Sequence, residues 1–131
     1  MNKIINDINC EFNIKGTINK LPEESFDGNT EYKYKLTNEY DEWKYQKLAT
    51  QMNYRINEGM GKAIYIIGVS DKGIPHGIKN NDMIITLNKI LKIIKIIDVK
   101  IIKVNIYIGL EGKILTMRLN KKLMKNDLSI L

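Results

Sequence analysis

Between Thr50 and Ile78 the spacing of apolar residues changes from that of a helix to that of a strand. Up to Asn57 the apolar positions recur every three or four residues, which predicts a helix over about 40–57; these positions are Tyr45, Leu48, Met52 and Ile56. Gly59 follows, and glycine readily adopts the left-handed conformation that closes a helix. Ala63 to Val69 is then a nearly continuous apolar run, which predicts a strand.

The residues after this strand are typical of a turn. Asp71 and Gly73 lie between two β-prone runs, which predicts a hairpin whose return arm ends near Ile78. Gly68 lies inside the predicted strand, where glycine usually marks a bulge or a close approach of another backbone.

Four more segments complete the pattern. Residues 31–36 alternate between charged and apolar side chains, which predicts a half-buried strand, and 83–97 carry a wide apolar stripe at helical spacing. Residues 100–108 and 113–120 alternate again and flank the turn at 109–112, which predicts a hairpin. The order strand, helix, hairpin, helix, hairpin predicts an α+β fold with two helices packed on one face of a mixed four- to five-stranded sheet.

The chain of 131 residues is long enough for one such domain but not for two. Residues 1–29 are polar and contain the breakers Pro22 and Gly28, so we expect a flexible N-terminal arm, with Ile4, Ile5 and Ile8 able to dock as a short helical turn. Residues 30–122 are expected to hold the α+β domain, and 123–131 form a tail in which a new apolar strand begins.

Charge is distributed unevenly along the chain. Residues 1–78 contain 10 basic and 11 acidic residues, whereas 79–131 contain 11 basic and 4 acidic residues, within an overall charge of +6. A basic half of this kind is compatible with phosphate contact, and equally with lysine serving as the default surface residue. Cys10 is the single cysteine, which excludes an internal disulfide and favours a reducing compartment such as the cytoplasm. The most apolar stretch, 83–108, is interrupted by charged residues, so we expect no membrane association.

The sequence lacks the motifs of nucleotide hydrolysis. Neither Gly61-Lys62 nor Gly112-Lys113 has the upstream glycine and following hydroxyl of a phosphate-binding loop, and no N-K-x-D pattern is present. His76 is the single histidine and has no partner that would make a catalytic triad or a metal site. We therefore expect no catalytic residue, cofactor or metal in this chain.

Two blocks of the sequence resemble a known family. T-Q-M-x-Y-R-I-x-E-G-x-G-x-A-I-Y-x-I-G-V-x-D-x-G at 50–73 and E-Y-K-Y-K-L at 31–36 are similar to the N-terminal domain of the elongation-factor-like translational GTPases known as GTP-binding proteins one and two, and the resemblance covers roughly 21–97. It implies a non-catalytic accessory domain of a GTPase, which would contact the GTPase core, the ribosome, or transfer or messenger RNA. GTP and magnesium would belong to the parent protein. The tail strand at 128–131 would lead into the parent's phosphate-binding loop, which implies that this chain is an excised N-terminal piece.

Two alternatives remain open. The order of elements and the I-G-V-x-D-x-G segment at 67–73 also resemble Alba-like domains, including those of Schlafen proteins, which implies a free-standing nucleic-acid-binding module. No convincing counterpart of the Schlafen acidic cluster is present. A protein-interaction domain that uses its helical face is the third interpretation.

If both helices cover one face of the sheet, residues of the opposite alternation lie on the other face. That reasoning predicts a nucleic-acid-binding surface made of Lys33, Lys35, Lys103, Asn105, Tyr107 and Arg118. Cations beside an exposed tyrosine offer phosphate contact and base stacking. The competing interpretation is that the lysines solvate the sheet and the N-terminal arm covers Tyr107.

Overall fold

Five strands form one mixed sheet in the computed structural model, which describes residues 2–9 and 13–122. The strand order is β1-β4-β5-β3-β2, with bounds Ile14–Thr17 for β1, Thr30–Lys33 for β2, Lys62–Ile67 for β3, Lys100–Ile108 for β4 and Lys113–Asn120 for β5. The central pairs β3–β5 and β4–β5 are antiparallel, whereas the edge strands β1 and β2 pair in parallel with β4 and β3. The predicted α+β class and the mixed sheet are confirmed.

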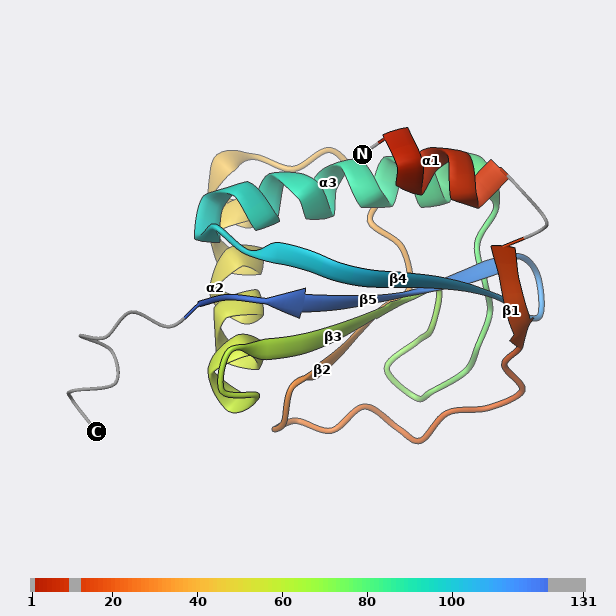
Figure 1. Ribbon diagram of the computed structural model, residues 1–131, viewed down its shortest axis with the longest axis horizontal. Helices are drawn as coiled ribbons and strands as arrows, with labels where there is room; N and C mark the ends of the chain where they lie inside the picture. The colour runs from red at the N-terminus through yellow and green to blue at the C-terminus, as the bar shows by residue number, and fades with distance from the viewer. Residues whose placement is uncertain (1, 10–12, 123–131) are drawn as a thin grey trace.

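Three helices cover one face of this sheet, one more than the sequence predicted. They are α1 (Asn2–Asn9), α2 (Glu42–Glu58) and α3 (Asn80–Ile97), and all three contribute to the same buried cluster. Figure 1 shows α1 lying beside α3 on one side of the sheet, with the long loop between β1 and β2 on the other side. We call the face opposite the helices the outer face.

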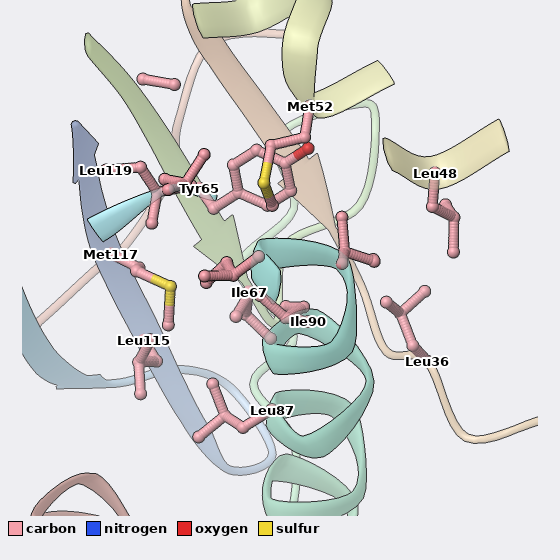
Figure 2. Packing of buried hydrophobic residues seen from close by; sticks show 14 of the residues in the cluster. Leu36, Leu48, Met52, Tyr65, Ile67, Leu87, Ile90, Leu115, Met117 and Leu119 are labelled. Atoms are coloured by element: carbon pink, nitrogen blue, oxygen red, sulfur yellow. The ribbon is translucent and has the colours of Figure 1, made fainter. Parts of the chain in front are cut away.

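The main core lies between the helices and the inward side chains of the central strands. Tyr65 and Ile67 point from β3 towards the helical layer, where Met52 of α2 and Leu87 of α3 are fully buried (Figure 2). Alternate residues of β5 close the cluster, as the period of two in a strand requires; these are Leu115, Met117 and Leu119. The predicted apolar stripes of α2 and α3 are therefore the faces that these helices bury against the sheet.

The helix α2 begins at Glu42, two residues after the start that the apolar spacing predicted. Asp41 is the N-cap, and its carboxylate accepts a hydrogen bond from the Lys44 amide at 2.8 Å. Glu42 in the first turn favours the positive end of the helix dipole. The helix ends at Glu58, next to Gly59 as predicted, and the Gly59 amide donates to carbonyls of the last turn. Gly59 itself is not left-handed, since its φ is −97°; the positive φ values fall on Met60 and Gly61 instead.

The first of the two predicted hairpins is not formed. After β3 the chain runs through an irregular segment, 68–79, to α3, and β3 finds its antiparallel partner in β5 instead. This segment packs against the β4–β5 turn through backbone hydrogen bonds, among them Leu110 to Pro75 and Glu111 to His76. A β-bridge between Ile78 and Lys113 closes the contact. A turn signal after a strand gives no information on which strand the chain will pair with.

Residues 1–29 were expected to form a flexible arm from which Ile4, Ile5 and Ile8 could dock as a short helical turn, and the structure packs part of this segment against the domain. Ile8 of α1 is buried in the main core and Ile4 packs beside it, while β1 extends the sheet by pairing with β4. The loop that follows β1 then crosses the outer face through Ile18 and Leu21. The tail at 123–131 lies outside the described residues.

Gly68 directly follows β3 and supports a stability prediction. Its φ is +98°, and a Cβ atom there would lie 3.0 Å from the backbone oxygen of Lys113. We expect Gly68→Val to lower the free energy of unfolding by about 1–3 kcal/mol despite the β propensity of valine, because a left-handed β-branched residue is strained. Urea unfolding of both proteins measures the difference, and an unchanged midpoint contradicts the backbone conformation.

Candidate nucleic-acid interface

The structure separates the six residues of the predicted nucleic-acid-binding surface into two groups. Four of them, on β4 and β5, lie on the outer face as expected: Lys103, Asn105, Tyr107 and Arg118. Lys33 and Lys35 come from β2 and the residues after it, and they lie on the helical side. The predicted surface is therefore only partly assembled.

The alternation of β2 is opposite to the one that the sequence suggested. Tyr32 pairs in register with Ile66 on the outer face, so Glu31 and Lys33 point towards the helices. Lys33 forms an ion pair with Glu31 at 3.2 Å, and both side chains are largely buried. Lys35 pairs with Asp82 of α3 at 3.8 Å. A charged set faces inward here because α2 supplies a buried arginine, Arg55, that the periodicity of β2 cannot reveal.

Lys103 and Arg118 are brought directly opposite each other. The antiparallel register of β4 and β5 places them in one cross-strand pair, and both side chains are exposed. Two cations in this position repel each other in the absence of a ligand, by a modest amount on an exposed surface. Neither is within 4 Å of a carboxylate among the described residues. The pair is therefore available to an anionic group.

Tyr107 is partly buried and packs with a second, smaller cluster on the outer face. The buried members of this cluster are Tyr32, Val69 and Ile114, and the loop after β1 contributes Ile18 and Leu21. The segment after β1 and Tyr107 thus pack against the same cluster, and the side chain of Tyr107 is only partly exposed. A tyrosine packed in this way is not a free platform for base stacking.

Sequence reasoning missed two cations of the same face. Lys62 and Lys100 both pair in register with Asn120, one on each side of β5, in the cross-strand row next to Lys103 and Arg118. They share the alternation of Lys103 and Arg118, and both are exposed. Part of the signal was present in the sequence, because each is the first residue of a strand and Lys100 lies three positions before Lys103. We call Lys62, Lys100, Lys103 and Arg118 the basic end of the outer face.

A cleft of about 590 Å³ on the helical side contains the most buried charges of the domain. Arg55 of α2 is 4% exposed, and its Nε donates to Glu31 at 2.9 Å. The remaining guanidinium nitrogens donate to the backbone oxygens of Ser25, Asp27 and Gly28, each at 2.9 Å. Arg55 therefore clamps the loop before β2 onto α2. Arg55 follows Met52 by three residues and so lies on the buried stripe of α2.

The electrostatics of this cleft fit a structural role. Burial raises the pKa of Glu24, the Tyr32 amide that donates to its carboxylate lowers it, and the nearby Glu31 and Asp71 raise it further. Burial also raises the pKa of the Tyr65 hydroxyl, and the neighbouring Glu31 adds to the effect. Apart from Gln51 Oε1, which is buried without a hydrogen-bond partner, the cleft's buried polar groups satisfy one another. The charges hold the loop and the helix together.

The remaining candidates for a site are His76 and the possible metal ligands of the described residues. His76 lies 5.0 Å from Tyr34, measured between ring centroids, in a tilted aromatic pair. Within residues 2–9 and 13–122 no three His, Cys, Asp or Glu side chains are grouped so that they could hold a metal ion. Nor does this part of the chain contain a helix with the length and apolarity needed to cross a membrane.

Comparison with known proteins finds a partial relationship to a GTP-binding protein. The chain is 46% identical over 63 residues to GTP-binding protein 2 of Mus musculus and, equally, to that of Homo sapiens. The matched stretch covers 48% of this chain but only 10% of each mammalian protein, so the chain spans a small part of these relatives.

A viral protein is similar over a longer stretch. The chain is 35% identical over 110 residues to the uncharacterized protein R625 of Acanthamoeba polyphaga mimivirus, which covers 82% of this chain and 58% of that protein. No protein-family model matches the chain, and no experimentally solved structure matches it either.

Proposed function

We propose that this chain is a non-catalytic accessory domain associated with a GTPase of the translation-elongation-factor type. The observation that carries the proposal is the 46% identity over 63 residues to GTP-binding protein 2. Because the matched stretch is a tenth of that protein and the sequence has no phosphate-binding loop, the role that fits is one outside the nucleotide site. The domain would contact the GTPase core, the ribosome or RNA, in the cytoplasm.

Nucleic-acid binding is a second candidate function, and one observation favours it. The basic end places four exposed cations on two adjacent cross-strand rows. Backbone phosphates are the ligand that such a surface attracts most generally. This candidate is compatible with the first, since an accessory domain of a GTPase could supply an RNA contact.

GTP itself is expected not to bind this chain. It lacks the loop that would hold the phosphates and the N-K-x-D pattern that would recognise guanine. Isothermal titration with GTP and magnesium should give no heat of binding, and GDP serves as a parallel control. A micromolar dissociation constant for either nucleotide would contradict the assignment of a non-catalytic role.

The association with a GTPase is tested by binding in trans. Human GTP-binding protein 2 would be prepared without the segment that is similar to this chain, and its affinity for the purified chain measured by surface plasmon resonance. We expect saturable micromolar binding to the shortened protein and weaker binding to the intact one, whose own segment competes. Absence of binding to both, with GTP or GDP present, would contradict the association.

A further inference from the structure

We propose that the basic end of the outer face binds single-stranded nucleic acid, with one unstacked base seated in a cavity beside Arg118. This inference deepens the nucleic-acid contact proposed above and rests on it. RNA and single-stranded DNA share the required chemistry, namely a phosphate backbone and bases with free edges.

The first support is the arrangement of the cations. Lys103 lies opposite Arg118, and Lys62 and Lys100 flank the neighbouring Asn120, so the cations occupy two rows that are about 6.6 Å apart, twice the rise per residue of a strand. The strands β3, β4 and β5 contain no acidic residue, so nothing on them neutralises this charge. The basic end is a stripe across three strands, suited to one extended phosphate backbone.

A β-bulge adds an apolar side chain to this stripe. The register of β4 against β5 shifts between Ile101 and Lys103, so that Ile102 has no residue opposite it. Ile101 packs against the main core, whereas Ile102 is 59% exposed. A large isoleucine exposed at a bulge among lysines has no role in the core, and bulges often redirect a side chain towards a functional surface.

A cavity of about 330 Å³ lies beside Ile102. Its lining combines the apolar side chains of Ile64 and Ile102 with polar groups from Arg118, Asn29 and Asn120. This volume is at the lower end of the range for small-molecule sites, which are likewise mostly apolar with a few polar groups. Arg118 offers a planar guanidinium on which a base can stack, and the asparagine amides offer donors and acceptors for a base edge.

These features favour a single strand over a duplex. A base can enter the cavity only when it is unstacked and unpaired, which a single strand allows at little cost. On the other half of the outer face, Ile18 and Leu21 pack against the small cluster of Tyr32, Val69 and Ile114. The accessible surface is therefore a short stripe with one cavity, too small to span successive grooves of a duplex.

The test is fluorescence anisotropy of the full chain with three labelled ligands of one sequence: single-stranded RNA, single-stranded DNA and the RNA duplex. We expect salt-dependent binding of one or both single strands and weaker binding of the duplex. Lys103→Ala should weaken binding and reduce the salt slope by about 0.7, as expected when one phosphate contact to a single strand is lost. Ile102→Ala should weaken binding by roughly tenfold without changing the salt slope, because it removes only contact with the base.

Matched controls are available on the helical side of the molecule. Lys95→Ala removes the same charge from an exposed position of α3, and Ile96→Ala shortens an isoleucine of α3 that is 44% exposed. Both controls should leave the affinity unchanged, and thermal melts should confirm that all four variants fold. Loss of affinity in the two outer-face variants alone supports the proposal. An unchanged affinity of Ile102→Ala, or tighter binding of the duplex, overturns it.

The result is separable from the proposed GTPase association. The same variants are tested for binding to human GTP-binding protein 2 without its similar segment. If that binding persists while neither single strand binds, this inference fails and the association stands. If the single strands bind and the GTPase does not, the association fails while the nucleic-acid site stands.

Discussion

Arg55→Ala should lower the free energy of unfolding by about 3 kcal/mol, at the low end of the range for breaking a buried ion pair. The substitution leaves Glu31, which is 3% exposed, without its closest partner, and Lys33 compensates only in part. It also removes the donors to three backbone oxygens of the loop before β2. An unsatisfied buried polar group adds its own desolvation penalty. Urea unfolding followed by circular dichroism measures the change.

Two further variants separate the causes of this loss. Arg55→Lys keeps the charge but cannot form the same fork of hydrogen bonds, so we expect it to recover only part of the stability. Glu31→Gln in the Arg55→Ala background removes the unpaired charge and should restore part of what was lost. Lys47→Ala, at an exposed position of the same helix, is the control. If Arg55→Ala unfolds at the same urea concentration as the parent protein, the clamp does not stabilise the fold.

Leu87→Ala should cost about 2–5 kcal/mol, the range for truncating a leucine in a well-packed core. Leu87 is fully buried and lies in the cluster that joins α3 to Leu115 and Met117 of β5 (Figure 2). Removing its isobutyl group leaves a cavity between the helical layer and the sheet, because the packed side chains of both layers cannot move to fill it. Thermal and urea unfolding both measure the change.

The matched control for Leu87 lies on the same helix. Ile85 is 40% exposed, so Ile85→Ala removes apolar surface without creating a buried cavity and should cost less than about 1 kcal/mol. Leu48→Ala, on α2 and also in the main core, should resemble Leu87→Ala. An unchanged melt for Leu87→Ala would contradict the placement of α3 on the sheet.

The candidate site could be predicted from the sequence only in part. The alternation of β4 and β5 placed Lys103 and Arg118 correctly, because both strands carry an apolar set that must face the core. The same rule failed for β2, where tyrosine and charge alternate and both sets can be buried. Glu31 is buried because it forms a hydrogen-bonded ion pair with Arg55. The two residues are 24 positions apart, so no local pattern reveals the pair. Alternation placed Tyr107 on the outer face correctly, but its side chain packs against the same cluster as Ile18 and Leu21. The path of these two residues depends on the edge pairing of β1.

Local patterns established the helices α2 and α3 with their buried stripes, the strands β3, β4 and β5, and the inward face of β5, because burial of an apolar stripe or of alternate residues depends on the spacing of neighbours in the chain. The pairing of β3 with β5, the docking of α1 and β1, and the burial of Arg55 follow from long-range contacts. Local sequence cannot choose these partners. The edge of a strand can pair with any extended segment, and the partner of a buried charge comes from residues far away in the chain. The bulge at Ile102 belongs to this second group, because its extra residue is defined only by the strand opposite.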